Sequence, residues 1–343
     1  MRHLRPIILI LAMLLMLGAV SCGVSDEPKS VTYYEYFDTV CYISSYRGSA
    51  ESDDEFSQIC AELESLFERY HRLFDIYHEY EGINNLATVN KCAGESSVDI
   101  SVELIDFLLY GKEIYHLTHG EVNIAMGSVL SLWHRSRQVG TALPSNNDLI
   151  LAASHTSIDV IEIDKAAGRV YVNDEKAMID VGAIAKGYVA ERAAELLESR
   201  GIGSYVINLG GNIRAVGQKP DGKGWVTGIT KPYGGDGEFV CRIVLSDASC
   251  VTSGSYQRYF EVDGKKYHHI IDKDTLYPSE HFASVSVIAA DSALADALST
   301  ALFSMTYDEG LALCDSIGNI QVIWVKDNGE ILTTEGISAI FAN

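Results

Sequence analysis

A change in the spacing of apolar residues limits the folds open to this chain. Between Phe56 and Tyr77, apolar side chains recur at the three-four spacing of one helical face, which predicts a core helix. From residue 158 the pattern changes: Ile158 to Ile163 predicts a strand, 166–168 a turn and 170–172 the antiparallel return. The sequence therefore predicts an α+β fold with largely antiparallel sheets and packed helices.

Further elements follow from caps and turn signals. Ser101 predicts the start of a second helix that ends before Gly120, and Asp263-Gly264 predicts a hairpin. The remaining predictions are helices near Asn147, at 186–199, at 292–305 and near Leu311, strands at 205–208 and 285–289, and a hairpin around 327–329. No Pro/Ser-rich linker follows residue 30, so residues 33–343 are predicted to form one domain.

The N-terminus predicts export. Arg2 and Arg5 precede an uncharged apolar run, 6–20, that is short for a bilayer span and typical of a signal peptide. Small residues before Cys22 resemble a bacterial lipobox, although Ala19 stands where leucine is usual. We expect a signal peptide at 1–21, lipidation of Cys22, a linker at 22–32, and a protein anchored to the extracytoplasmic face of the cell membrane. A plain secretory peptide and an uncleaved anchor remain alternatives.

Charge and cysteine spacing exclude two classes of partner. The formal net charge of −21 argues against nucleic acid, because phosphate binding requires basic patches. Acidity is compatible with divalent cations, and it also simply keeps an exported protein soluble. The cysteines lack any C-x-x-C pair, so a zinc site is not expected, and disulfides are permitted but not required.

The segment 180–188 has the features of a phosphate site. It lies where a predicted strand ends and a helix begins, and free helix amides together with Lys186 would favour an anion such as a diphosphate. Asp180 opens the segment. A plain tight turn is the alternative interpretation.

A carboxylate and a hydroxyl share one face of the late helix. Asp296 and Thr300 are four residues apart, so their oxygens can meet at one point, and hard oxygen ligands suit Mg²⁺ or Ca²⁺. Alternatively, Thr300 bonds back to the carbonyl of Asp296, or Asp296 is only solvated.

Two adjacent histidines follow the Asp263-Gly264 hairpin. Strand alternation would direct His268 and His269 to opposite faces, so we expect one to face a site, as a proton-transfer group or phosphate contact, and the other to lie on the surface. The segment 208–212 brings backbone close to a ligand or another strand. Gly201-x-Gly203 lacks the third glycine of a dinucleotide fingerprint, which excludes a Rossmann site.

Taken in order, these segments resemble the FAD:protein FMN transferase family, also called ApbE, over nearly the whole mature chain. The resemblance implies a single ApbE-like, T-fold-like catalytic domain. It is carried by Phe74-Asp75-Ile76-Tyr77 with 83–86, and by 180–188, 208–212, 252–260, 269–278 and 295–300.

The resemblance implies site residues. Asp296, Thr300 and the main-chain oxygen of Ala183 would hold Mg²⁺, and Tyr77 would lie against the flavin ring. The remaining FAD contacts implied are Asp180, Lys186, Ile271 and the stretch Glu121, Val122 and Asn123.

The chain departs from the family pattern at three places. Val122-Asn123 replaces the usual Phe-Asp, and Phe37-Asp38 replaces Met-Gly. In the loop 272–278, Lys273 and Leu276 stand where proline and glycine are usual, which puts the loop shape and the role of His269 in question.

The family activity is Mg²⁺-dependent transfer of FMN from FAD to a Thr or Ser hydroxyl of a target protein, with release of AMP. His269 or Asp296 would supply the base. The implied partners are FAD and flavin-acceptor subunits of exported or membrane redox complexes. The sequence also allows an FAD pyrophosphatase, which would give FMN and AMP, or a non-catalytic flavin-binding lipoprotein.

Overall fold

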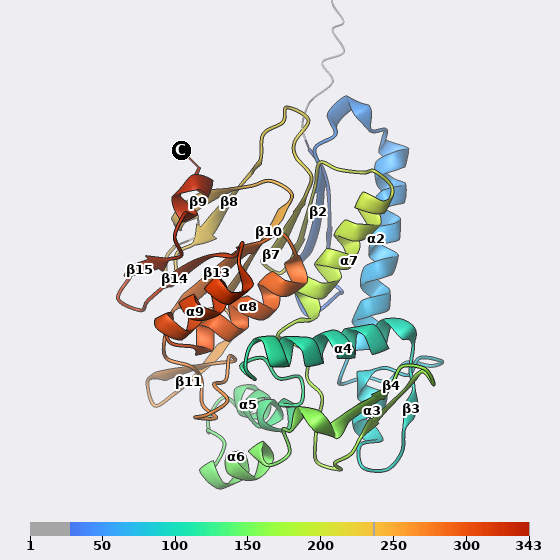
Figure 1. Ribbon diagram of the computed structural model, residues 1–343, viewed down its shortest axis with the longest axis vertical. Helices are drawn as coiled ribbons and strands as arrows, with labels where there is room; N and C mark the ends of the chain where they lie inside the picture. Colours follow the sequence, from blue (N-terminus) through green and yellow to red (C-terminus); the bar gives the residue numbers. More distant parts are fainter. Residues whose placement is uncertain (1–27, 236, 343) are drawn as a thin grey trace, which may run out of the picture.

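The computed structural model describes residues 28–235 and 237–342 (Figure 1). The predicted signal peptide and Cys22 lie outside the described residues. Strand β1 (Lys29–Tyr33) pairs with β2 (Cys41–Ser45), so the end of the predicted linker, 22–32, belongs to the sheet, and the domain boundary placed at residue 33 is corrected. The described residues contain no helix with both the length and the apolar character needed to cross a membrane.

An antiparallel sheet forms the centre of the molecule. Its eight described strands run in the order β1-β2-β6-β7-β10-β13-β14-β15, and every pairing in it is antiparallel. The strands beyond β2 are β6 (Tyr205–Leu209), β7 (Asn212–Val216), β10 (Ala248–Gly254), β13 (Ser284–Ala289), β14 (Gln321–Val325) and β15 (Ile331–Thr333). This confirms the predicted α+β class with largely antiparallel sheet.

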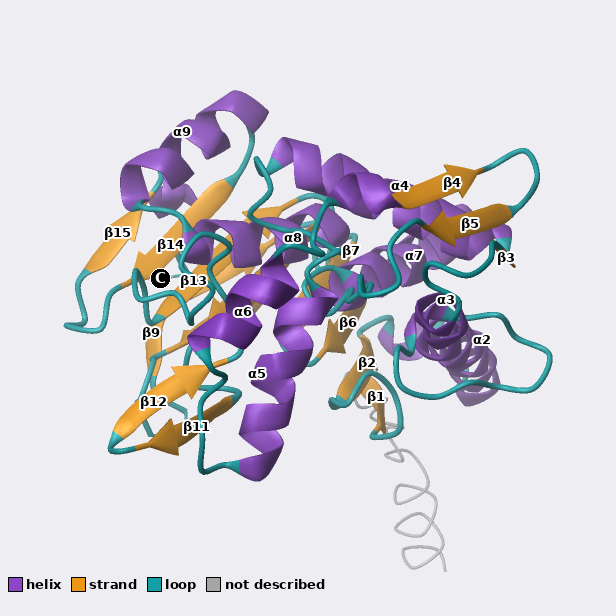
Figure 2. Ribbon diagram, turned by 90° about the horizontal axis from the view of Figure 1, so that it is seen from below, coloured by secondary structure: helices purple, strands orange, loops and turns teal. Residues whose placement is uncertain are grey.

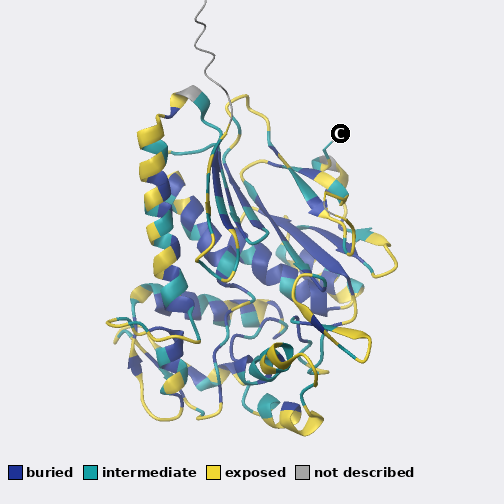
Figure 3. Ribbon diagram, turned by 180° about the vertical axis from the view of Figure 1, so that it is seen from behind, coloured by how far each residue is buried: buried dark blue, intermediate teal, exposed yellow. Residues whose placement is uncertain are grey.

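Helices cover one face of this sheet (Figures 1 and 2). They are α2 (Asp53–Phe74), α7 (Ala185–Ser199), α8 (Ser292–Ser304) and α9 (Tyr307–Ile317). Helix α8 packs on β10 and β13, and α7 packs on β6 and β7. Figure 3 shows that α8 and the sheet strands beneath it are buried, as their uninterrupted apolar and small side chains require.

The opposite face of the sheet is covered by the hairpin of β8 (Trp225–Thr230) and β9 (Phe239–Leu245). Trp225, Ile229 and Ile243 of this hairpin pack against sheet residues such as Ala215 and Cys250. The main sheet is therefore the middle layer of three.

A second region follows α2 and lies below the sheet in Figure 1. It contains α3 (Leu86–Lys91), α4 (Val102–Leu117), α5 (Gly127–Val139) and α6 (Asn146–Ala153), with the small sheet of β3 (Val98–Asp99), β4 (Ile161–Asp164) and β5 (Arg169–Val172). The hairpin of β11 (Tyr259–Val262) and β12 (Lys265–His268) packs beside α5. Its turn is the predicted Asp263-Gly264, with φ of 52° and 78°.

Two of the elements that differ from the sequence prediction, α2 and α5, contribute residues to the cleft described below. Helix α2 ends at Phe74, so Tyr77 lies beyond it in a loop, because the Asp75 carboxylate accepts hydrogen bonds from the amides of Tyr77 and His78. Helix α5 has no counterpart in the prediction. It lacks a side-chain N-cap and buries only Gly127, Val129 and Trp133, so its apolar pattern is weak.

Candidate active site

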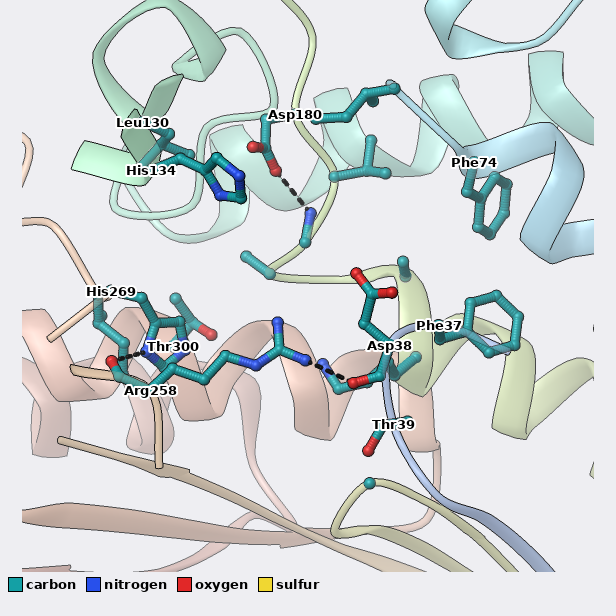
Figure 4. A pocket seen from close by; sticks show the side chains of 18 of the residues that line it. Phe37, Asp38, Thr39, Phe74, Leu130, His134, Asp180, Arg258, His269 and Thr300 are labelled. Carbon is teal, nitrogen blue, oxygen red and sulfur yellow. Dashed lines mark hydrogen bonds between the residues drawn. The ribbon is translucent and has the colours of Figure 1, made fainter. Parts of the chain in front are cut away.

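The predicted site residues lie on the wall of one cleft of about 1050 Å³. They come from distant parts of the chain and from both regions of the molecule. The set is Tyr77, Glu121, Val122, Asn123, Asp180, Ala183, Lys186, His269, Ile271, Asp296 and Thr300. Figure 4 shows Asp180 and His134 on one side of this cleft and His269, Arg258 and Thr300 on the other.

Helices α7 and α8 meet at a glycine in the cleft. A Cβ on residue 187 would lie 2.3 Å from the Asp296 Cβ and 2.4 Å from the Ser292 carbonyl oxygen, and both of those atoms belong to α8. Only glycine permits this approach. The Gly187 amide donates to Asp296 Oδ2 at 2.7 Å, so the backbone of α7 fixes the carboxylate of α8.

Asp296 is a buried carboxylate, with 4% of its surface exposed. Burial raises its pKa, whereas Lys186 and the Gly187 amide lower it. The Lys186 Nζ lies 4.0 Å from Oδ2. Asp296 is therefore not a solvated surface residue, which removes one of the two alternatives for this motif.

The hydroxyl of Thr300 faces the cleft. It lies 3.5 Å from Ser253 Oγ, and the back-bond to the Asp296 carbonyl is made by Ser299 instead, at 2.9 Å. The second alternative, in which Thr300 makes that bond, is therefore wrong. Thr300 is left with its oxygen available to a ligand.

The carbonyl of Ala183 lacks its helical partner. At the start of α7 the amide of Tyr188 donates to Ile184, but the Gly187 amide, which would reach Ala183, donates to Asp296. Among the described residues no donor reaches the Ala183 oxygen. Asp296, Thr300 and Ala183 thus offer a carboxylate, a hydroxyl and a carbonyl oxygen, which is the donor chemistry that Mg²⁺ prefers.

This set contains a single carboxylate. Within residues 28–235 and 237–342, no three His, Cys, Asp or Glu side chains form a metal-binding cluster. The candidate cation site therefore depends on neutral oxygens and on what a ligand adds.

His269 lies directly after β12, at the base of the hairpin. Its Nδ1 lies 3.2 Å from the carbonyl oxygen of Arg258, and a carbonyl can only accept, so Nδ1 carries the proton and Nε2 has a free lone pair. Burial lowers the pKa of His269 to about 3, with further lowering from Arg258. The imidazole is therefore neutral at physiological pH.

The sequence predicted that the other histidine of the pair lies on the surface, but His268 is buried. His268 Nε2 lies 2.8 Å from the Ser279 carbonyl oxygen, and its ring packs edge-on against Phe303. Strand alternation correctly separated the two rings, but Ser279 and Phe303 pack against the His268 ring. Surface exposure could not be read from the strand pattern.

Residues 37–324 match the model of the ApbE family. The chain belongs to the ApbE family. A relative named FAD:protein FMN transferase from Klebsiella pneumoniae is 30% identical over 76% of this chain and 83% of its own length. One of the same name from Treponema pallidum is 29% identical over 94% of this chain and 92% of its own length.

Solved structures have the same fold. The ApbE protein from Thermotoga maritima superposes with a TM-score of 0.82 at 26% identity, covering 92% of this chain and all of its own. The apo form of the Pseudomonas stutzeri flavinyl transferase ApbE gives 0.75 at 23% identity, over 92% of this chain and 98% of its own. The predicted ApbE-like single-domain fold is confirmed.

The loop 272–278 departs from the ApbE pattern in sequence but forms an ordered turn. Leu276, where the family usually has glycine, has φ of 61°, the left-handed conformation that glycine adopts freely. Its amide donates to the Asp272 carbonyl, and its own carbonyl accepts from Trp133 Nε1 at 2.9 Å. The loop therefore accepts a strained leucine and is held in place from α5.

Lys273 connects this loop to the cleft wall. Its Nζ lies 3.3 Å from Glu121 Oε1 and 2.7 Å from Asp274 Oδ2. Burial raises the pKa of Glu121, and Lys273 lowers it. Lys273, which replaces the usual proline, thus forms an ion pair with the half-buried carboxylate of Glu121 on the cleft wall.

The neighbouring pair Val122-Asn123 serves the fold. Val122 is buried, and Asn123 donates to the Thr156 carbonyl while accepting from the Ala125 amide. An aspartate could not make the first bond, so the asparagine here fits this chain. The contact of both residues with a nucleotide stays a prediction.

Residues 37–39, the third departure, form part of the cleft beside the β6–β7 turn. A Cβ on Gly210 would lie 2.1 Å from Thr39 Oγ1, so the close approach predicted for 208–212 is made to this segment as well as to the cleft. The carbonyl of Asp38 accepts a hydrogen bond from Arg258 at 3.0 Å. Arg258 thus ties residues 37–39 to the hairpin that carries His269.

Sequence reasoning missed several polar side chains of the cleft. His134 and Arg137 come from α5, which was not predicted, and Arg258 was noted only as part of a motif. The Asn212 side-chain amide is buried on the cleft wall, where it helps to lower the pKa of the Asp296 carboxyl. The glycines of 208–212 and the resemblance both pointed to the segment that contains Asn212, whereas only the resemblance, through 252–260, pointed to Arg258.

Proposed function

We propose that this protein transfers FMN from FAD to a Thr or Ser hydroxyl of a target protein and releases AMP. Membership of the ApbE family and relatives named FAD:protein FMN transferase support flavin transfer. The observation that carries the proposal is the junction of α7 and α8. There a buried carboxylate, a hydroxyl and an unpaired carbonyl oxygen lie near Lys186, which is the one lysine among the described residues that line the cleft.

The donor set fits Mg²⁺, which Asp296, Thr300 and the Ala183 carbonyl would hold. When bound, this ion would neutralise charge on the diphosphate of FAD. Lys186 adds a positive charge at the same place, and the buried Asn212 amide favours the charged form of Asp296. These groups bind and orient the diphosphate, which is most of what phosphoryl transfer needs.

In the transfer step, the acceptor hydroxyl oxygen forms a bond to the FMN phosphorus. The bond from that phosphorus to the bridging oxygen breaks, and AMP leaves with that oxygen. The proton of the hydroxyl moves to Nε2 of His269, whose lone pair is free because Nδ1 is engaged by Arg258. The negative charge of a bound diphosphate would raise the pKa of His269 from its low value toward neutrality.

Asp296 is the weaker candidate for the base. One of its oxygens already accepts from Gly187, and the carboxylate lies against Lys186. A carboxylate held in this way favours a cation-binding role. We therefore assign proton transfer to His269.

We further propose that the protein acts at the extracytoplasmic face of the membrane, anchored through a lipid on Cys22. The apolar run and the small residues before Cys22 support this. The acceptors would be subunits of exported or membrane redox complexes. Replacing Cys22 by serine should release the protein from the membrane fraction, and an unchanged distribution would contradict lipid anchoring.

The activity is tested by incubating the protein with FAD, Mg²⁺ and a flavin-acceptor domain, followed by mass analysis of the acceptor. Acceptor that carries covalent FMN supports the proposal. AMP and free FMN without acceptor labelling would instead show an FAD pyrophosphatase. FAD that stays intact while bound would show a flavin-binding lipoprotein without turnover.

The matched control is an acceptor domain whose target hydroxyl is removed. It should abolish labelling while leaving FAD binding unchanged. A second control replaces Mg²⁺ with a chelator, which should stop transfer if the oxygens of Asp296, Thr300 and Ala183 hold the ion.

A further inference from the structure

The cleft has an aromatic surface apart from the α7–α8 junction. The Tyr77 ring, from the loop after α2, lies 5.4 Å from the His134 ring of α5, centroid to centroid, with 31° between the planes. Both rings line the cleft, and 55% of the Tyr77 surface is exposed. An exposed aromatic pair within a cleft is a surface on which a planar ring can stack.

Both rings are held in position. Asp75 accepts from the Tyr77 amide at 2.7 Å and also from Tyr80, which fixes the turn that presents Tyr77. Both ring nitrogens of His134 are engaged by side chains of α5. Nδ1 lies 3.0 Å from Arg137 Nη2, and Nε2 lies 2.9 Å from the side-chain amide of Gln138. The orientation of the imidazole is therefore set from its own helix.

The surroundings of His134 favour its neutral form, which suits stacking. Burial lowers its pKa, and Arg137 and Arg258 lower it further, whereas Asp180 and Asp38 act in the opposite direction. A neutral imidazole presents an apolar face to a ring. His269, by contrast, contacts Arg258 and lies on the other side of the cleft (Figure 4).

We propose that His134 binds substrate, by extending the Tyr77 ring into a stacking surface for one of the two planar rings of FAD. The inference rests on the proposed function for the identity of the substrate. It assigns a role to a residue that neither the sequence motifs nor the predicted ligand set contained. It also separates ring binding at α5 from diphosphate binding at α7 and α8.

The test compares His134→Ala, which removes the ring, with His134→Phe, which keeps a flat ring and loses the polar nitrogens. The dissociation constants of FAD, FMN and AMP are measured for each variant by calorimetry in the presence of Mg²⁺. His116→Ala is the matched control, because His116 is exposed on α4 and does not line the cleft.

We expect His134→Ala to weaken FAD binding about tenfold, as loss of one base–aromatic stack does, and His134→Phe to stay within about twofold of wild type. Loss confined to FMN places the flavin ring on this surface, and loss confined to AMP places the adenine ring there. FAD affinity unchanged in His134→Ala, or equal weakening of FMN and AMP, would overturn the stacking role.

The outcomes separate this inference from the proposed function. Wild-type protein that binds FAD and labels the acceptor, with variants that bind equally well, contradicts only the role of His134. Wild-type protein that binds FAD without labelling the acceptor contradicts the transfer reaction, while the stacking comparison still stands. Wild-type protein that binds no FAD overturns both.

Discussion

The α7–α8 junction and the α5–loop contact both shape the cleft, but they are built in different ways. At the junction, Gly187 lets two backbones approach and a single amide fixes Asp296. At the other contact, Trp133 packs among the large side chains of the β11–β12 hairpin and donates to the carbonyl of Leu276. The first contact tolerates almost no change in volume. The second is made of side chains that can adjust.

The comparison teaches that the two contacts constrain different things. The junction fixes the reacting groups, since its atoms are backbone or belong to Asp296 itself. The α5 contact positions Trp133 on the cleft wall through its hydrogen bond to Leu276, the residue with the strained backbone. Changes at the junction should therefore affect activity most, and changes at the loop should affect mainly stability.

The largest effect is expected for Asp296→Asn. The amide keeps an oxygen for the Gly187 amide but loses the charge, so the protein should fold and its rate of FMN transfer should fall about 10²- to 10³-fold. Single-turnover transfer and a thermal melt measure the two quantities. Asp315→Asn, on the exposed side of α9, is the control. Full activity in Asp296→Asn would remove the assigned cation site.

Gly187→Ala should come next. The added methyl would overlap Asp296 Cβ and the Ser292 carbonyl, so α7 and α8 must separate, at about 1–3 kcal/mol of stability. Denaturant unfolding measures this cost, and the transfer rate should fall with it. Gly203→Ala is the control, because a Cβ there meets nothing closer than 4.0 Å. Equal stability of the two variants would show that the junction is not tightly packed.

A third test uses the pKa of His269, which burial lowers to about 3. The unfolded chain binds a proton near pH 6.5 that the folded protein cannot hold, so stability falls as pH drops from about 7 to about 5, by at most about 2 kcal/mol. His269→Gln should lose less stability over the same range. Parallel pH profiles for the two proteins would contradict a buried neutral imidazole.

The smallest effect is expected in the loop. Leu276→Gly and Leu276→Ala both remove the side chain, but only glycine adopts φ near 61° without strain. The glycine variant should therefore be the more stable of the two by about 1 kcal/mol, measured by denaturant unfolding. Equal stabilities would mean that the loop shifts to relieve the strain when the side chain is lost.

Much of the fold was predictable because its signals are local. The long apolar face of α2, the Asp263-Gly264 turn and the four-residue spacing of Asp296 and Thr300 each depend on neighbouring residues. Strand order was not predictable, since pairs such as β2 with β6 join segments far apart in the sequence. Helix α5 was missed for a related reason. Trp133 is held by residues of the distant β11–β12 hairpin and the loop 272–278, not by its own helix.

The sequence predicted the reacting groups of the candidate site, but it did not predict several of the residues that surround them. The four-residue spacing predicted Asp296 and Thr300, and the resemblance added Ala183. The carbonyl of Ala183 is free because the Gly187 amide donates to Asp296, a residue 109 positions away in the sequence. His134 was missed with α5. His268 was placed on the surface because alternation says which side a ring faces, not what covers that side.

The first turn of α7 has one backbone bond left open at Ala183, because the amide that would close it serves Asp296. The protein alone therefore carries a small, localised deficit in its hydrogen bonding that a cation with its nucleotide would fill. Binding should then slow hydrogen exchange in this turn before any chemistry occurs, and should raise the melting temperature of a catalytically dead variant such as His269→Gln. Occupancy of the site could thus be followed in a protein that never turns over.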